Sequence, residues 1–167
     1  MRREIAINIL YEPLGLEEGH KLLEVGLGSG YSVVVAREIV GPHGLVVSIE
    51  IDPLTFKQGK KFVESAGFHD IIIVQGDGCL GYPEMAPYDR ICITAACKEI
   101  PPTLIEQLKI GGKLIAPLIK KGLQEIVLIE KSDKGITSKV LSDEIYNTPY
   151  VPMRGVYGIE KDESPSS

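Results

Sequence analysis

The sequence predicts one α/β domain with a mostly parallel sheet of about seven strands and helices on both faces. Short apolar runs alternate with segments of helical character, which is typical of βαβ units. A glycine-rich turn, GLGSG at residues 26–30, directly follows the first apolar run. The length of 167 residues is that of one domain. We expect this domain to span residues 1–160, with a frayed polar tail at residues 161–167.

The expected elements follow in chain order. Strands are predicted over residues 21–28, 44–51, 70–78, 88–96, 113–119 and 124–133, and helices over residues 31–40, 53–67 and 101–110. The second helix begins with Pro53 and stops at Gly67, the usual asymmetry of a helix. A turn at residues 133–135 should return the chain as a final antiparallel strand. A short helix is expected before Pro13, ahead of the first strand.

Composition excludes several classes of function. The net charge of −5 gives no basic footprint, so we expect no nucleic-acid partner. No apolar run approaches the ~20 residues that cross a bilayer, so no membrane partner is expected. Cys79, Cys92 and Cys97 form no CxxC pair, which favours buried free thiols in a cytoplasmic protein. The three histidines lack metal-ligand spacing. We therefore expect a cytoplasmic monomer without a metal site.

The glycine turn is the first candidate for a ligand site. In an open α/β sheet, ligands bind beyond the carboxyl ends of the strands, close to the first βα turn. Gly26, Gly28 and Gly30 would let the backbone turn sharply and approach a ligand. A plain tight turn would also explain these glycines. The dinucleotide fingerprint GxGxxG fails, because its last position falls on Tyr31 or Val33.

Three carboxylates stand at the ends of three consecutive strands. Glu24, two residues before Gly26, would repel a pyrophosphate and attract a ligand with an ammonium and a sulfonium, which favours S-adenosylmethionine over NAD. Glu50 ends the second strand, where a carboxylate can accept hydrogen bonds from ribose hydroxyls. Asp77, between Gly76 and Gly78, could accept from an adenine amino group. Each residue alone could be an ordinary strand-end turn residue.

Longer motifs resemble one enzyme family. They are LLEVGLGSGYS, VVSIEIDP, GDGCLGYPEMAPYDRICITAACKEIP, LIEQLKIGGKLIAPL and YVPMRGVYG, and together they run from about residue 14 to 158. These motifs resemble the Rossmann-like class I S-adenosylmethionine-dependent methyltransferases and, more narrowly, the protein-L-isoaspartate O-methyltransferase family. The resemblance implies S-adenosyl-L-methionine as cofactor and methylation of a carboxyl group of L-isoaspartyl residues in damaged proteins.

The resemblance also implies roles for individual residues. The methionine part of the cofactor would be lined by Glu24, Gly26, Gly28 and Ser29, the last of which we interpret as a helix cap. Glu50 would hold the ribose, and Asp77 with Gly78 the adenine. Thr94 and Ala95 would border the methyl-transfer site. Near the peptide substrate would lie Val151, Pro152 and Arg154.

No catalytic residue is predicted. A carboxyl acceptor is already ionised at neutral pH and needs no general base. The position after the fourth strand has TAACKE in place of the [DN]PP[YF] loop of amino-group methyltransferases, and NTPY at residues 147–150 lies far downstream. Methylation of nucleic-acid bases is therefore not expected. Cys79 and Cys97 have no neighbouring histidine and are expected to be structural.

Two features depart from the family pattern. The family carries an N-terminal segment with a Thr-Ile-Ser-type motif, whose serine lies next to the transferred methyl, and MRREIAINIL matches only the helix after it. Cys97 stands where the family has a small residue. We therefore expect the 167-residue sequence by itself to bind cofactor weakly and to methylate an isoaspartyl peptide slowly or not at all. The alternative function is that of an S-adenosylmethionine-binding relative with another acceptor or no catalytic activity.

Overall fold

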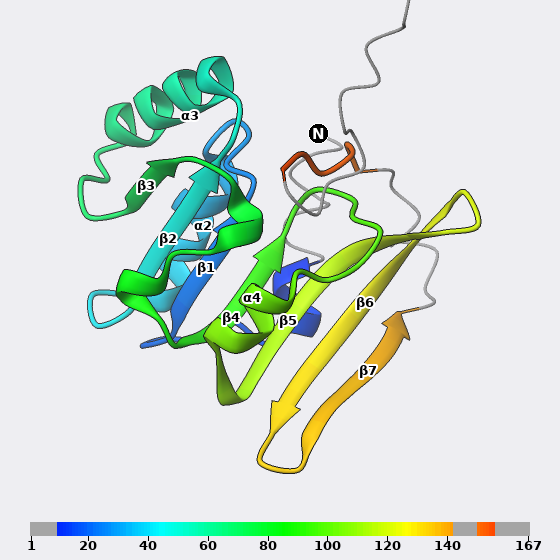
Figure 1. Cartoon of the computed structure of the whole chain (residues 1–167). Coiled ribbons are helices and arrows are strands. Elements are labelled where there is room, and N and C mark those ends of the chain that lie inside the picture. Colours follow the sequence, from blue (N-terminus) through cyan, green and yellow to red (C-terminus); the bar gives the residue numbers. More distant parts are fainter. Residues whose placement is uncertain (1–9, 142–149, 156–167) are drawn as a thin grey trace, which may run out of the picture.

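The computed structural model describes residues 10–141 and 150–155. Within these ranges the chain forms one seven-stranded sheet with helices on both faces (Figure 1). The strands, in the spatial order β3-β2-β1-β4-β5-β6-β7, are β1 (Lys21–Val25), β2 (Leu45–Glu50), β3 (Ile72–Gln75), β4 (Tyr88–Ile93), β5 (Leu108–Lys120), β6 (Leu123–Ser132) and β7 (Gly135–Leu141). The helical elements are α2 (Tyr31–Val40), α3 (Pro53–Ser65), α4 (Pro102–Gln107) and the 3₁₀ turns η1 (Gly78–Leu80) and η2 (Pro83–Met85). The predicted fold class is confirmed.

The direction of the C-terminal strands differs in one respect from the prediction. β1 to β5 pair in parallel, β6 is antiparallel to β5, and β7 is antiparallel to β6. Two tight hairpins therefore reverse the chain twice. Lys121 and Gly122 form the first hairpin loop, both with positive φ, as in a type I′ turn. Among the described strands it is thus β6, not the last strand, that runs against the other six.

Two apolar clusters cover the two faces of the sheet. The face towards α2 and α3 buries side chains from both helices and from the segment before β1, among them Leu10, Leu14, Val33, Ala36 and Val63. The opposite face buries Leu104 of α4 together with Leu23, Val25, Val47 and Ile91 of the central strands. Strands buried on both faces explain why the central segments of the sequence are almost continuously apolar.

Some element boundaries differ from the predicted ones. β1 ends at Val25 because Gly26, with a φ of 102°, turns the chain out of the sheet. α4 ends at Gln107, and Leu108 already pairs with Tyr88 of β4. Residues 10–14 are helical, so the helix expected before Pro13 includes that proline. The predicted tail at residues 161–167 lies outside the described residues. None of the described helices has the length and apolar character that would cross a membrane.

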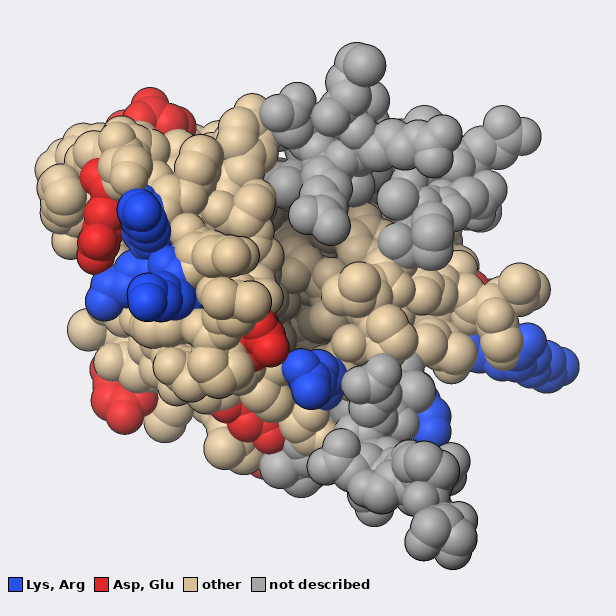
Figure 2. All heavy atoms as spheres, turned by 90° about the horizontal axis from the view of Figure 1, so that it is seen from above, with Lys and Arg blue, Asp and Glu red and all other residues tan. Residues whose placement is uncertain are grey.

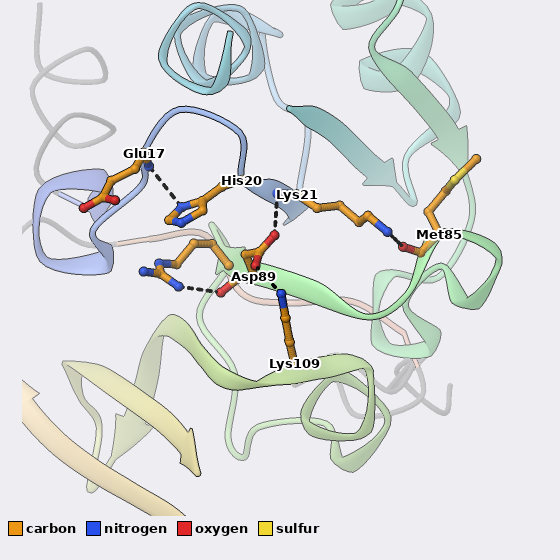
Figure 3. A network of polar contacts seen from close by, with 7 residues as sticks. Glu17, His20, Lys21, Met85, Asp89 and Lys109 are labelled. Atoms are coloured by element: carbon orange, nitrogen blue, oxygen red, sulfur yellow. Dashed lines mark hydrogen bonds and ion pairs between the residues drawn. The ribbon is translucent and has the colours of Figure 1, made fainter. Parts of the chain in front are cut away.

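A polar network ties β1 to β4 at the amino ends of these strands (Figure 3). The carboxylate of Asp89 accepts a hydrogen bond from the Lys21 backbone at 2.9 Å and pairs with Lys109 at 3.4 Å. The Lys21 ammonium in turn donates to the carbonyl of Met85 at 2.8 Å. Burial opposes ionisation of Asp89, but these interactions outweigh it and lower the pKa of the carboxyl group. The network thus joins β1, β4 and the start of β5 at the edge opposite the glycine loop.

The glycine loop, residues 26–30, packs directly against α3. A Cβ atom added to Gly30 would stand 2.7 Å from the carbonyl oxygen of Gly59, and one added to Gly59 would stand 2.7 Å from that of Gly28. Gly59 lies in the middle of α3 and is buried. A glycine in a helix interior costs about 0.5–1 kcal/mol relative to alanine. Here the glycine allows the backbone of α3 to touch the backbone of the glycine loop.

Replacement of Gly59 tests this contact. Gly59→Ala should lower the free energy of unfolding by about 1–3 kcal/mol, because overpacking against the loop outweighs the gain in helix propensity. Thermal or denaturant unfolding would measure the change. Gln58→Ala, an exposed neighbour in the same helix, is the control and should be close to neutral. A Gly59→Ala variant more stable than the parent would show that the loop does not depend on this approach.

Candidate active site

The carboxyl ends of the central parallel strands meet at one edge of the sheet. The glycine loop follows β1, and Glu50, Asp77 and Thr94 follow or end the next three strands. Figure 2 views this edge from above and shows a hollow near its middle, with walls made largely of residues other than Lys, Arg, Asp and Glu. The topology therefore places the glycine loop, Glu50, Asp77 and Thr94 around one edge.

The glycine loop is closed on one side and open on the other. A Cβ atom on Gly26 would stand 2.3 Å from the hydroxyl oxygen of Thr94, whose hydroxyl lies 3.0 Å and 2.9 Å from the carbonyl oxygens of Val25 and Gly26. Gly28, in contrast, is exposed, and no atom lies within 4 Å of where its Cβ would be. The loop thus rests on β4 and presents bare backbone at Gly28.

Glu50 connects the end of β2 to this loop. Its carboxylate accepts hydrogen bonds from the backbone N–H groups of Gly28, at 3.2 Å, and Asp52, at 3.1 Å. The side chain is almost buried, with 9% of its surface exposed. A carboxylate has about four lone-pair sites, so two backbone donors leave capacity for further donors.

Asp77 occupies the equivalent place after β3. Its side chain accepts a hydrogen bond from the backbone of Cys79 at 2.9 Å and so caps η1. A Cβ atom on Gly78 would stand 2.3 Å from Val25, and one on Gly155 would stand 2.1 Å from the Asp77 carboxylate. Gly78 therefore lets the backbone after Asp77 lie against Val25, Gly155 lets a second segment lie against Asp77 itself, and Gly76 faces open space.

The end of β4 meets residues from the C-terminal part of the chain. Ala95 is half-buried, and the next residue, Ala96, forms a bridge to Pro152. Val151 is 71% exposed. Arg154 forms an ion pair with Asp52 at 3.6 Å, beside the end of β2. Of the three residues expected near a peptide, Val151 and Pro152 therefore lie by the end of β4, whereas Arg154 pairs with Asp52, two residues after Glu50.

Glu24 is enclosed by protein groups beneath the glycine loop. Its side chain is completely buried, and its two carboxylate oxygens accept short hydrogen bonds from the hydroxyl groups of Tyr11 and Ser32. Burial raises the pKa of Glu24 to about 7, although both hydrogen bonds act in the opposite direction. A direct contact between this side chain and a sulfonium stays a prediction. Glu24 instead ties the first turn of α2 to the segment before β1.

Ser29 differs from its predicted role as a helix cap. The N-cap of α2 is Gly30, in a left-handed conformation and without a side-chain hydrogen bond. The Ser29 hydroxyl accepts a long 3.4 Å contact from the backbone of Tyr31 and is otherwise exposed. The N-cap position therefore falls on Gly30, one residue after the serine, where glycine adopts the left-handed conformation without steric cost.

Comparison with known proteins decides the family. A family model described as protein-L-isoaspartate(D-aspartate) O-methyltransferase matches residues 5–157. The chain belongs to this family. Protein-L-isoaspartate O-methyltransferase 1 of Archaeoglobus fulgidus is 41% identical over 152 residues, which cover 91% of this chain and 68% of that protein. The corresponding protein of Methanococcus aeolicus is 40% identical, with the same coverage.

Solved structures agree with this assignment. A protein-L-isoaspartate O-methyltransferase superposes with a TM-score of 0.84 at 35% identity, covering 91% of this chain and 47% of the other. A Plasmodium falciparum structure in complex with S-adenosyl-L-homocysteine has a TM-score of 0.73 at 21% identity, covering 87% and 70%. The family membership confirms the predicted enzyme class, an S-adenosylmethionine-dependent methyltransferase, and the predicted cofactor.

The residues at this edge fit the family's cofactor. A nucleoside needs acceptors for its hydroxyl and amino groups and backbone that allows close approach. Glu50 and Asp77 supply carboxylates at neighbouring strand ends, and Gly28 and Gly76 leave space where a side chain would otherwise stand. An adenosine could therefore be held between the ends of β2 and β3 by residues that the sequence predicted.

Several supporting residues were not predicted. Tyr11 donates a hydrogen bond to Glu24, and Gly59 lies against the glycine loop. Asp52 donates a hydrogen bond to Glu50, and Gly155 lies against Asp77. A sequence signal existed for Asp52, since an Asp before Pro53 is a typical helix cap. The others become visible only when segments distant in the sequence are brought together.

The buried carboxyl of Glu24 predicts a pH dependence of stability. Its pKa is raised in the folded state, so between about pH 4.5 and 7 the folded chain binds a proton that the unfolded chain has lost. The stabilisation by this proton is fully present below that interval. As the pH rises through the interval, the free energy of unfolding falls by about 3 kcal/mol. Glu24→Gln should remove this loss. Denaturant unfolding at several pH values would compare the variant with the parent.

Glu64→Gln, at an exposed position of α3, is the matched control and should follow the parent at every pH. Parallel stability curves for the parent and Glu24→Gln would contradict the assignment of a proton to Glu24.

Proposed function

We propose that this chain is an S-adenosylmethionine-dependent methyltransferase that methylates a carboxyl group of L-isoaspartyl residues in damaged proteins. The observation that carries the proposal is the pair of carboxylates, Glu50 and Asp77, placed beside an open glycine loop in a chain of this family. The names of the relatives describe this reaction, and the family model extends over residues 5–157.

The proposed division of roles follows the geometry. Glu50 would accept from the ribose hydroxyls, and Asp77 with Gly78 would border the adenine. Gly26, Gly28 and Ser29 would lie along the methionine part, with Gly28 giving the closest approach. Glu24 would act from beneath, by holding the start of α2 through Ser32. Further residues at the end of β4 would border the acceptor, namely Thr94, Ala95, Val151 and Pro152.

The chemistry asks for orientation more than for proton transfer. When bound, the cofactor supplies an electrophilic methyl group on a positively charged sulfur. The residues of the chain need to hold the acceptor carboxylate in line and to exclude water. A carboxylate with an ordinary pKa is ionised at pH 7, so no general base is required. The walls of the hollow in Figure 2, which consist largely of residues other than Lys, Arg, Asp and Glu, suit this task.

We also propose that the protein acts as a monomer in the cytoplasm, without a nucleic-acid or membrane partner. Cys79, Cys92 and Cys97 are all buried free thiols, which suits a reducing compartment. The acidic net charge of −5 disfavours binding to phosphate backbones. Light scattering at several protein concentrations would test the oligomeric state.

Transfer of labelled methyl from S-adenosylmethionine to a peptide tests the proposed reaction. An isoaspartyl peptide should accept label at least about tenfold faster than the matched aspartyl peptide, because the site must place one carboxyl geometry in line. Glu50→Gln should weaken binding of S-adenosylhomocysteine about tenfold or more, through loss of hydrogen bonds to a charged group. Glu64→Gln is again the control.

The two parts of this experiment separate the alternatives. Binding of S-adenosylhomocysteine without transfer to either peptide would favour a cofactor-binding relative with another acceptor or no catalytic activity. Absence of binding, or equal binding by the parent and Glu50→Gln, would overturn the assignment of the site.

A further inference from the structure

Residues 150–155 form a strap across the carboxyl edge of the sheet. This segment, orange to red in Figure 1, lies above the ends of the parallel strands. Tyr150 packs with the apolar cluster on the α2 face, whereas Met153, only 2% exposed, packs into the cluster on the α4 face. The strap therefore crosses from one layer of the domain to the other.

Its backbone is attached at two points. The side chain of Gln124, on β6, accepts from the backbone N–H of Tyr150 at 2.7 Å and donates to its carbonyl at 2.8 Å. Ala96, after β4, donates to the carbonyl of Val151 at 2.8 Å and accepts from the N–H of Met153 at 2.7 Å. These bonds hold the first four residues of the strap firmly to β4 and β6.

The last two residues continue over the proposed nucleoside side of the site. The guanidinium of Arg154 lies 3.6 Å from one oxygen of Asp52, and Gly155 lies against the carboxylate of Asp77. Asp52 links Arg154 to Glu50 and to the start of α3. Its other oxygen accepts from the backbone and hydroxyl of Thr55, each at 2.8 Å, and its own N–H donates to Glu50.

The charge of Asp52 is maintained by its surroundings. Hydrogen bonds from Thr55, with a smaller contribution from Arg154, lower the pKa of its carboxyl group. The side chain of Arg154 is 55% exposed and that of Asp52 is 37% exposed. The attraction between them is therefore modest and is screened by salt.

We propose that Arg154 and Asp52 form a latch that holds the end of the strap over the nucleoside side of the cofactor site and so slows release of cofactor and product. Arg154 is then a positioning residue, acting through Asp52 and Glu50, and not a contact for the peptide. This inference rests on the proposed function, because it needs the nucleoside to lie between Glu50 and Asp77.

Dissociation of S-adenosylhomocysteine from the full chain tests the latch. Arg154→Gln should raise the dissociation rate by up to about fivefold, the range of an exposed ion pair, and Arg154→Lys should largely restore the parent rate. Asp52→Asn should raise the rate similarly, since Asn still caps α3. The double variant should be no faster than either single variant. At about 1 M salt the parent should approach the rate of Arg154→Gln.

The control is Lys109→Gln, which removes a similarly exposed cation, 58% accessible, from the ion pair with Asp89 at the opposite edge (Figure 3). It should leave the dissociation rate unchanged. Equal rates for Arg154→Gln, Lys109→Gln and the parent would overturn the latch, as would fully additive effects of Arg154→Gln and Asp52→Asn. A parent chain that did not bind S-adenosylhomocysteine at all would instead refute the proposed function.

Discussion

The close contact of the glycine loop with its neighbours is the constraint on which the rest of the carboxyl edge depends. Gly26 allows the loop to rest on Thr94, and Gly30 and Gly59 allow it to touch α3 backbone to backbone. A loop supported on both sides has little freedom to move. It can therefore present the bare backbone of Gly28 to the hollow and direct its N–H towards Glu50.

A buried acid lies beneath this loop. Glu24 is enclosed by hydroxyl groups from α2 and from the segment before β1, so its carboxyl joins three elements below the place where the cofactor would bind. Burial of a carboxylate is unfavourable unless it is hydrogen-bonded, and both oxygens here have partners. The buried Glu24 lowers the stability of the fold near neutral pH, but its hydrogen bonds hold the elements beneath the glycine loop together.

The fold could be predicted from the sequence because its causes are local. Apolar runs of strand length, a Pro53 start and glycine stops determined most elements, and the position of each carboxylate after a strand brought Glu50 and Asp77 to one edge. Contacts between distant segments could not be predicted from the sequence. The buried position of Glu24 depends on Tyr11, and that of Arg154 depends on Asp52. Ser29 lost the cap because Gly30 takes a left-handed turn, a conformation that glycine permits but does not require.

Hydrogen exchange of backbone amides, with and without S-adenosylhomocysteine, tests most directly whether the carboxyl ends of β1 to β4 form the cofactor site. Bound ligand should slow exchange at the glycine loop, after β2 near Asp52, around Gly78 and in the strap at Met153. The network of Lys21 and Asp89 at the opposite edge should be unaffected. Binding that protected the opposite edge, or that left the glycine loop unchanged, would contradict this account of the site.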